Sequence, residues 1–428
     1  MKKYIFAIVL LIIVLLNLGC KKAPTEPNTT AALSVEDISC TEAWVKITSA
    51  NIQIPNTLTL FVNDKADQNI TLVSSDTLLY VDSLLPNRSY KIKATFAANN
   101  RQQTTNEVVA TTMDTTSHNF SWQTFTFGEH SSSVLYDVAI IDENNIWAVG
   151  EIYTKDSYTY DSLGKWIDPY NAVHWNGSDW ELIRIYYNYR GTPSWSPIRT
   201  IFAFANNDIW YSSGLHWNGK IFEQPDNGAF DGWEPNKMWG TSSSDLYAVG
   251  NNGNIAHYDG KNWQKLESGT TLNINDIWGI KDNSGNNLIY CPAYNFGSGG
   301  GKKLLKIEGN KIGEINWVQN KELYTCWFNT PHKLYAGGEG LFYKVYGNWK
   351  EEVISHYFVF RVRGNSLSDI WAAGGFGFAA HFNGSSWRVF DEVTLTDGNY
   401  YGLTVKENLI SLVGREGRKA VITLGRKY

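Results

Sequence analysis

A short pattern of residues recurs along most of the chain and limits what the chain can fold into. It usually places an aspartate or asparagine two residues before an aromatic residue, and it occurs at 145–150, 208–210, 245–250, 333–338 and 369–374. A second pattern runs histidine, aromatic, asparagine or aspartate, glycine, and it occurs at 174–177, 216–219, 257–260 and 381–384. A period of roughly 30 to 45 residues indicates a repeat architecture.

Each repeat supplies four short strands, because its asparagine-glycine or aspartate-glycine pair places a tight hairpin before an outer aromatic strand. Four antiparallel strands per repeat make a β-propeller blade. The motifs predict roughly seven blades, which begin near Val134, Ile198, Asn236, Ile274, Leu323, Tyr357 and Tyr400. The last unit ends without an outer strand, whereas 122–125 resembles the outer strand at 263–266. We therefore predict a propeller over 120–428 in which 120–127 supplies the missing strand and closes the ring.

The composition indicates an all-β protein with more than one domain. The 428 residues exceed what one hydrophobic core usually organises, and the 18 Trp, 24 Tyr, 19 Phe and 37 Gly suit aromatic strands joined by tight turns. A net charge of -5 without a long Lys or Arg run argues against nucleic acid as a partner. Cys40, Cys291 and Cys326 have no metal-binding spacing, so we expect buried thiols, and a pairing of Cys291 with Cys326 stays open. No cofactor and no metal site is predicted.

The N-terminal residues read as a targeting signal. Lys2 and Lys3 precede an apolar run over 4–18 that ends at Leu18-Gly19-Cys20. This segment resembles the signal of bacterial lipoproteins, which implies a signal peptide over 1–20, lipidation of Cys20 and a tether over 21–31. The resemblance implies a protein of the bacterial cell envelope, held to the outer membrane or cell surface by its lipid. An ordinary cleaved signal or an uncleaved anchor remains the alternative.

A smaller domain is predicted over 32–113. Tyr90, Ile92, Ala94 and Phe96 alternate with polar residues, which is the pattern of a strand with one buried face. The run 85–90 resembles the tyrosine corner of fibronectin type III domains, which implies a β-sandwich. A related immunoglobulin-like sandwich stays open. No residues here cluster into a site, so we interpret the domain as a spacer.

The repeats resemble those of uncharacterised bacterial surface propellers, and this resemblance carries no active site. Because His174, His216, His257 and His381 recur once per unit, a structural role fits them better than metal binding or general-base catalysis. We expect each ring to bond the next hairpin. The repeated Asp208, Asp245 and Asp369 are expected to cap turns.

Insertions that break the repeat are the better place to look for function. Four stand out, at 151–172, 186–197, 226–235 and 294–302, and the strand assignment places all of them on one rim of the propeller. Tyrosine and tryptophan dominate recognition surfaces, because they offer large contact area at low entropic cost. The predicted ligand-binding residues are Tyr158, Tyr160, Trp166, Tyr170, Tyr189, Arg190, Trp195, Trp233 and Tyr294. They suit a carbohydrate or another extended ligand, unless the rings only pack on one another.

Two other functions remain open. Asp156, Asp161, Asp168 and Asp231 lie in the same loops, and two carboxylates suffice for a glycan-active hydrolase or lyase. No motif selects a pair, so the sequence favours a binding protein over an enzyme. The third possibility is a scaffold that binds surface proteins.

Overall fold

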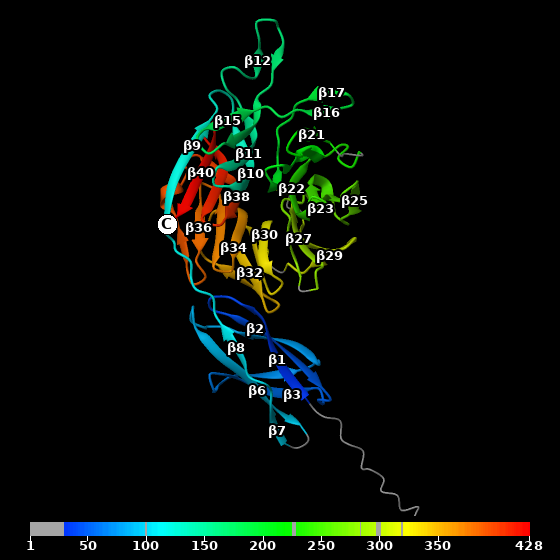
Figure 1. The fold of residues 1–428 in the computed structure, drawn as a ribbon, viewed down its shortest axis with the longest axis vertical. Coiled ribbons are helices and arrows are strands. Elements are labelled where there is room, and N and C mark those ends of the chain that lie inside the picture. The colour runs from blue at the N-terminus through cyan, green and yellow to red at the C-terminus, as the bar shows by residue number, and fades with distance from the viewer. Residues whose placement is uncertain (1–29, 99–100, 225–227, 283, 297–300, 318–319) are drawn as a thin grey trace, which may run out of the picture. The chain divides into compact units, whose positions relative to one another are not determined.

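The computed structural model describes residues 30–98, 101–224, 228–282, 284–296, 301–317 and 320–428, and the described chain is built of β-strands (Figure 1). The predicted signal peptide, Cys20 and the tether up to residue 29 lie outside these residues. The chain folds into two compact units. The first contains the described residues 30–36 with Trp44–Leu79 and Ser89–Ala110, and the second contains Asp37–Ala43, Tyr80–Arg88 and Thr111–Tyr428. The described residues contain no helix long and apolar enough to cross a membrane.

Two sheets make up most of the first unit. One sheet has the order β1-β2-β5 and the other β4-β3-β6-β7, with β8 beside β6. These strands are β1 (Thr30–Ile38), β2 (Ala43–Ala50), β3 (Asn56–Val62), β4 (Lys65–Leu72), β5 (Asp76–Val81), β6 (Ser89–Ala98), β7 (Arg101–Thr104) and β8 (Val108–Thr111). Ile92, Ala94 and Phe96 on β6 are buried, which confirms the predicted alternation, and Trp44 on β2 is fully buried with them.

The second unit contains seven four-stranded antiparallel sheets in its described residues. The strands are β10 (Val134–Asp142), β11 (Asn145–Ile152), β14 (Tyr170–Trp175) and β15 (Trp180–Ile183); β18 (Ile201–Ala205), β19 (Asp208–Tyr211), β20 (Leu215–Trp217) and β21 (Phe222–Glu223); β22 (Pro235–Ser242), β23 (Asp245–Gly250), β24 (Asn254–Tyr258) and β25 (Trp263–Glu267); β26 (Trp278–Lys281), β27 (Asn287–Tyr294), β28 (Lys302–Glu308) and β29 (Lys311–Ile315); β30 (Leu323–Thr330), β31 (Lys333–Gly338), β32 (Gly340–Val345) and β33 (Asn348–Glu352); β34 (Val359–Ser366), β35 (Asp369–Gly374), β36 (Ala379–Phe382) and β37 (Trp387–Val389); and β38 (Gly398–Lys406), β39 (Leu409–Glu416), β40 (Lys419–Lys427) and β9 (Phe120–Phe127).

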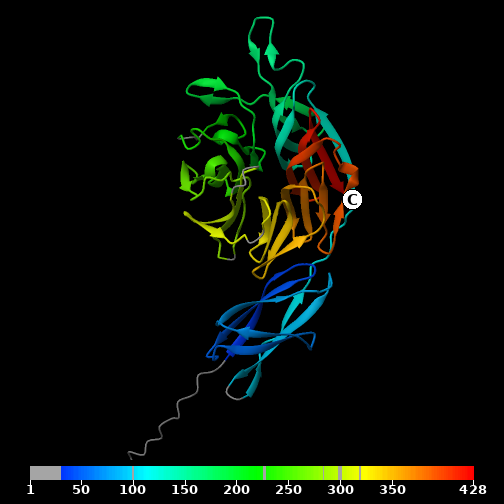
Figure 2. The ribbon, with the colours of Figure 1, turned by 180° about the vertical axis from the view of Figure 1, so that it is seen from behind.

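The sheets form a closed ring, which is the architecture of a β-propeller. Each first strand contacts the first strand of the next sheet, and β38 of the last sheet contacts β10 of the first. The last sheet takes its outer strand from before the first, because β9 pairs antiparallel with β40 from Phe120↔Lys427 to Phe127↔Ala420. Figures 1 and 2 show cyan β9 beside red β40. The predicted pairing of 120–127 with the end of the chain is therefore present.

Each of the four histidines stacks on the aromatic residue opposite it and bonds the acidic or amide residue two positions before that aromatic. In the sixth sheet, His381 stacks on Trp371 at 4.6 Å between ring centroids, and its Nε2 lies 3.1 Å from Asp369 Oδ1. The same geometry occurs in the sets Asn145, Trp147 and His174; Asp208, Trp210 and His216; and Asp245, Tyr247 and His257.

The expectation that these rings bond the next hairpin is wrong, because the strand pairing places each ring over its own sheet. The aspartate makes the connection to the next sheet instead. Asp245 Oδ2 accepts a hydrogen bond from Asn287 Nδ2 at 2.7 Å, and Asp208 Oδ2 accepts one from the Ser243 hydroxyl. Each set thus joins two strands of one sheet, and Asp208, Asp245 and Asp369 also contact the neighbouring sheet, Asp369 through Lys427.

A β-bulge interrupts the first strand at the same place in five of the seven sheets. In each of these sheets one residue of the first strand has no partner on the second strand, whereas the residues on either side of it do. The residues without a partner are Tyr136, Asn236, Tyr324, Phe360 and Tyr401. The residues that follow the bulges are Asp137, Lys237, Thr325, Arg361 and Gly402. A bulge redirects side chains locally, and such irregularities are common beside functional sites.

Buried charges lie among the first strands around the middle of the ring. Lys237 pairs with Asp137, and Asp276 pairs with both Arg361 and Arg363 at 2.8 and 2.6 Å between nitrogen and oxygen. Thr200 and Thr325 donate their hydroxyls to Asp137 and Asp276. Burial would raise the pKa of Asp276, but Arg363 and Arg361 hold it well below its ordinary value. Burial lowers the pKa of Lys237 to about 8, against the opposing effect of Asp137.

The three remaining cysteines are buried free thiols, as expected. Burial, the largest cause, raises the pKa values of Cys291 and Cys326 well above their ordinary value. Within the described part of the chain, no three His, Cys, Asp or Glu side chains gather as metal ligands.

The segment that leads into β9 contains a group that should make stability depend on pH. His118 Nδ1 lies 2.9 Å from His381 Nδ1, and since His381 Nε2 donates to Asp369, its Nδ1 accepts from His118. Burial, followed by the charge of His381, lowers the pKa of His118 from 6.5 to about 4. The folded protein therefore keeps His118 neutral at pH values at which the unfolded chain protonates it.

We expect this stabilisation to be complete above pH 6.5 and to be lost progressively as the pH falls towards 4. Thermal unfolding of the wild type and of His118→Asn, followed by circular dichroism across this range, measures the effect. The gap between their melting temperatures should shrink as the pH falls. Parallel curves would show that His118 does not titrate differently in the two states.

Candidate functional site: an aromatic groove on the propeller rim

The second insertion forms a hairpin that walls a groove. Strands β16 (Tyr187–Tyr189) and β17 (Thr192–Ser194) pair so that only Arg190 and Gly191 lie between Tyr189 and Thr192. Both turn residues have positive φ, at 50° and 84°, as a type I′ turn requires. Asn188 fixes the turn by accepting a hydrogen bond from Gly191 N–H at 2.7 Å. The turn therefore holds Tyr189 and Arg190 on an ordered support.

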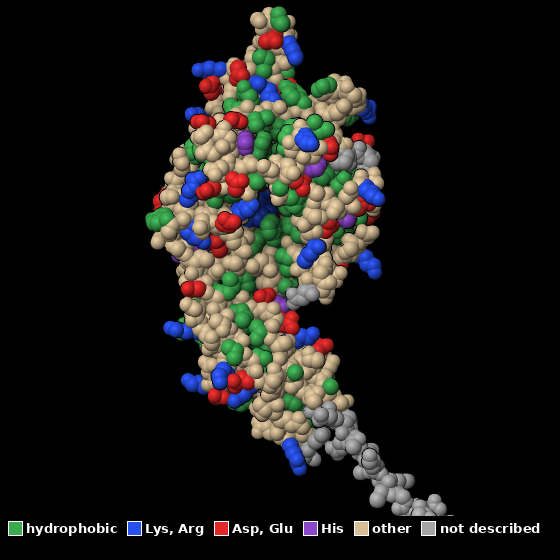
Figure 3. Space-filling view, viewed as in Figure 1, with side chains coloured by type: hydrophobic (Ala, Val, Ile, Leu, Met, Phe, Trp, Pro, Cys, Tyr) green, Lys and Arg blue, Asp and Glu red, His purple; other side chains and the backbone are tan. Residues whose placement is uncertain are grey.

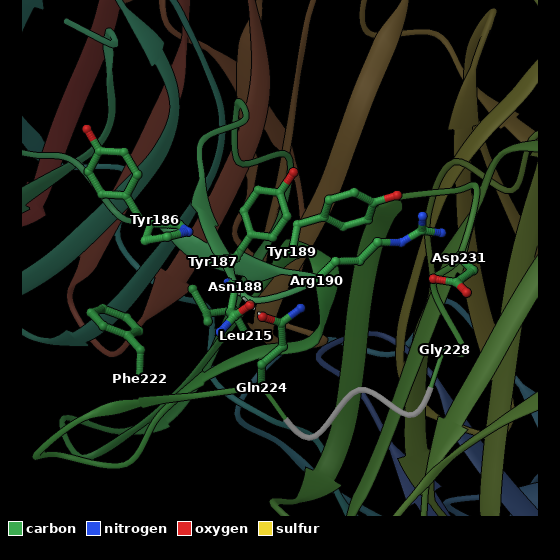
Figure 4. A pocket seen from close by; sticks show the side chains of 11 residues that line it. Tyr186, Tyr187, Asn188, Tyr189, Arg190, Leu215, Phe222, Gln224, Gly228 and Asp231 are labelled. Carbon is green, nitrogen blue, oxygen red and sulfur yellow. Dashed lines mark hydrogen bonds between the residues drawn. The ribbon is translucent and has the colours of Figure 1, made fainter. Parts of the chain in front are cut away.

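The groove has a volume of about 770 Å³ and is open to solvent. We call it the rim groove; its lining residues are Tyr186, Tyr187, Asn188, Tyr189, Arg190, Pro193, Leu215, Phe222, Gln224, Gly228 and Asp231. Gln224 attaches the hairpin to the second sheet by accepting a hydrogen bond from Asn188 N–H at 3.0 Å. Figure 4 shows the tyrosines along one wall and Arg190 reaching towards Asp231 at one end. The second and third insertions thus meet here.

The first insertion forms a second hairpin beside this groove. Strands β12 (Thr159–Tyr160) and β13 (Trp166–Ile167) pair, and Trp166 lies edge-on to Tyr158 and Tyr160 with both centroids at 5.1 Å. Trp166 also lines a hollow of about 460 Å³ whose wall includes Tyr186 and Pro193 of the rim groove. The two hollows therefore adjoin, and together they offer an extended surface.

Asp156 organises the base of the first insertion. It accepts hydrogen bonds from the hydroxyls of Thr154 at 2.6 Å and Tyr170 at 2.9 Å, and Arg184 stacks 3.7 Å from the Tyr170 ring centroid. The Thr154 hydrogen bond is the largest cause that lowers the pKa of Asp156. A general acid for glycoside cleavage needs a raised pKa, so Asp156 is unsuited to that role. Asp161 and Asp168 line the smaller hollow and Asp231 lines the rim groove.

The structure brings the nine predicted ligand-binding residues together only in part. Tyr189 and Arg190 line the rim groove, Trp166 lines the hollow beside it, and Tyr158 and Tyr160 are exposed next to Trp166. Tyr170 is half-buried under Arg184, and Trp195 is half-buried outside both hollows. These two residues shape the surface more than they offer contact to a ligand.

The other two predicted residues pack inwards. Trp233 lies against Phe230 at 5.1 Å and donates its indole N–H to the Ala229 carbonyl at 2.8 Å, so it stiffens its loop. The expectation of an exposed ring is wrong for Tyr294, which ends β27 and is only 5% exposed. Tyr294 continues a central strand, so its side chain enters the core, whereas Phe296 beyond it is exposed.

Sequence reasoning missed other lining residues. The sequence gives no sign that Asn188, Phe222 and Gln224 line the groove, because single polar or outer-strand residues do not interrupt the repeat. Charged residues inside otherwise apolar first strands, such as Asp137, Lys237 and Arg361, did carry a signal, because strands at the middle of a ring are buried. That signal could have located the buried charges.

Comparison with known proteins identifies the fold but no family. No protein-family model matches the chain, and no curated protein matches it. Among solved structures, "YCF48 bound to D1 peptide" is similar with a TM-score of 0.52 and 17% identity, over 73% of this chain and 99% of that chain. The WD40 β-propeller domain of Doa1 is similar with a TM-score of 0.53 and 10% identity, over 72% and 98%. The chain therefore contains a β-propeller that spans most of its length.

Proposed function

We propose that this protein is a binding protein whose rim groove holds an extended peptide segment of a partner protein. The observation that carries the proposal is the open groove of about 770 Å³, walled by tyrosines on an ordered hairpin. A similar propeller fold has been solved bound to a peptide, which supports the choice of a peptide over other extended ligands.

The chemistry of the groove suits a peptide of mixed character. Tyr186, Tyr187 and Tyr189 supply apolar faces with polar edges, so they can cover side chains and still bond to backbone groups. Asn188 and Gln224 add amide groups that match the donors and acceptors of a peptide backbone. Arg190 and Asp231 place opposite charges at one end, which would favour one direction of the chain.

The test is a binding measurement on the full-length protein with a randomised peptide library, followed by titration of the selected peptides. Tyr189→Ala and Arg190→Ala should each weaken binding by about tenfold or more, because aromatic and arginine side chains dominate such interfaces. Tyr357→Ala is the matched control; this tyrosine is 47% exposed and lies outside the groove. It should leave the affinity unchanged.

Two outcomes would overturn the proposal. Binding of oligosaccharides in place of peptides, lost in the same variants, would establish the carbohydrate ligand that the aromatic insertions first predicted. Release of a cleaved product from a glycan would establish the enzyme that the loop carboxylates left open.

We also propose the finer features that the sequence predicts. The seven sheets correspond to seven blades, the first unit is a fibronectin type III-like spacer, and lipid on Cys20 holds the protein at the bacterial cell envelope. The sheet orders β1-β2-β5 and β4-β3-β6 with β8 beside β6 support a two-sheet sandwich. Membrane fractionation of cells that express Cys20→Ser tests the anchor, since the variant should leave the membrane fraction.

A further inference from the structure

A set of displaced residues lies on the first strands around the middle of the propeller, apart from the lining of the rim groove. The five residues that the β-bulges displace, Tyr136, Asn236, Tyr324, Phe360 and Tyr401, occupy equivalent places in their sheets. Because their strands are the first strands of a closed ring, these residues surround its central channel on one side. We call this set the channel mouth.

Aromatic side chains cover one part of the channel mouth. The ring centroids of Tyr324 and Phe360 are 5.4 Å apart, and those of Phe360 and Tyr401 are 5.3 Å apart. The Phe296 ring centroid lies 5.6 Å from that of Tyr324. Phe296 is 57% exposed and the other three are half-buried, so the cluster is accessible. Figure 3 shows hydrophobic side chains gathered at the middle of the propeller, with Lys or Arg atoms set deep among them. An apolar segment would find a suitable surface here.

Two arginines, Arg361 and Arg199, lie next to residues of the channel mouth. Arg361 follows Phe360 in the chain, and Arg199 precedes β18 and lies 5.0 Å from the Tyr136 ring centroid. Burial is the largest cause of the raised pKa of Tyr324, and the charges that act on its phenol include those of Arg361 and Arg199. Arg361 therefore adjoins the aromatic cluster through Phe360, and Arg199 adjoins the channel mouth through Tyr136.

Arg361 is the most unusual of these residues, because it is buried with hydrogen-bonding capacity to spare. It is 5% exposed, and its Nε has no hydrogen-bond partner among the described residues. Its Nη1 lies 2.8 Å from Asp276 Oδ1 in an ion pair, so Nε is the donor that is left over. Asp276 accepts hydrogen bonds from Arg363 through both of its oxygens. A buried donor without a partner is costly, unless a ligand supplies the acceptor.

The balance of buried charge also favours a ligand that supplies a hydrogen-bond acceptor, and in particular a negatively charged one. Among the fully buried residues that the structure describes here, three cations, Lys237, Arg361 and Arg363, stand against two carboxylates, Asp137 and Asp276; the half-buried Glu151 accepts a hydrogen bond from Tyr136 at the mouth. One more carboxylate would neutralise the group. Guanidinium groups bind carboxylates through paired hydrogen bonds, which are among the stronger contacts in proteins.

We propose that the channel mouth binds a carboxylate carried on an aromatic or apolar segment of a partner, with Arg361 and Arg199 holding the carboxylate and Phe296, Tyr324 and Phe360 covering the apolar part. The carboxylate is either the C-terminus of a peptide or an acidic side chain beside an apolar residue. This site is independent of the rim groove, so either one can fail without the other.

Small probes test the site on the full-length protein by ligand-observed NMR titration. N-acetylphenylalanine carries a free carboxylate, and its amide is the neutral control. We expect the acid to bind about tenfold more tightly than the amide, since a hydrogen bond between a guanidinium and a carboxylate is stronger than one to a neutral amide. N-acetyl-aspartyl-phenylalanine amide carries only a side-chain carboxylate. Its binding relative to that of N-acetylphenylalanine decides which source the site prefers.

Variants assign the binding to the channel mouth. Arg361→Gln should remove the preference for the acid over the amide, and Arg199→Gln, at an exposed position that leaves the fold intact, should reduce it several-fold. Arg190→Ala in the rim groove should leave the preference for the acid over the amide unchanged. Equal binding of acid and amide to the wild type, or an undiminished preference in Arg199→Gln, would overturn the proposal even if Arg361→Gln failed to fold.

Discussion

Asp276→Ala should lower the free energy of unfolding by about 3–5 kcal/mol, the usual cost of removing one partner from a buried ion pair. Asp276 is fully buried and is the partner of both Arg361 and Arg363. Its removal would leave two guanidinium groups in the interior without a counter-charge, and would also take the acceptor from the Thr325 hydroxyl. Urea unfolding followed by tryptophan fluorescence measures the loss.

A double variant separates the charge from the packing. Arg361→Met in the Asp276→Ala background removes one of the two stranded cations, so it should restore part of the lost stability. Lys93→Ala is the control, because its ion pair with Asp64 lies at the surface of the first unit and surface pairs contribute little. A loss below about 1 kcal/mol for Asp276→Ala would show that the buried charges are screened by solvent that enters the channel.

Trp371→Ala should also destabilise the protein by about 3–5 kcal/mol, the range for deleting a large buried aromatic side chain. Trp371 is fully buried, stacks on His381, and contacts Phe120 of the closing strand at 4.8 Å between ring centroids. The substitution therefore leaves a cavity and also weakens the attachment of β9. Thermal and urea unfolding report the change.

The matched control is Trp166→Ala, which removes the same side chain from the rim hairpin. Trp166 is 39% exposed, so its loss should shift the unfolding midpoint far less. Equal effects of the two substitutions would contradict the assignment of Trp371 to the core and of Trp166 to the surface.

The repeat in the sequence predicted the propeller because each motif has a local physical cause. The hairpin glycines, such as Gly177 and Gly260, have positive φ, and the aromatic residues after them begin the outer strands. The pairing of 120–127 with β40 could be predicted for the same reason, since an unpaired outer position is visible in the repeat. The hydrogen-bond partners of the histidines could not be predicted from the sequence, because these partners depend on which face of the sheet the aspartate occupies.

The candidate site was only partly predictable. The length of the second insertion was enough to predict that Tyr189 and Arg190 belong to a site. Tyr294 was predicted on the same grounds but is buried. No local sequence pattern distinguishes an exposed tyrosine from one that continues a strand into the core. The bulge that displaces Tyr324 and Phe360 is a backbone event whose residues look like ordinary strand residues. Arg361 could be noticed in the sequence, but its partnerless Nε is a property of three-dimensional packing.

The closing strand has a consequence for how the protein is made. Thr124 and Thr423 share a hydrogen bond across 299 positions of sequence, and β40 ends at Lys427, one residue before Tyr428. A ribosome must therefore make the long stretch from β9 to β40 before β9 finds its partner, and until then β9 and β39 each present an unpaired edge. Contacts so distant in sequence also form slowly. The newly made chain is thus most exposed to misassembly in the interval between the synthesis of β9 and that of β40, when a chaperone that covers strand edges would help it most.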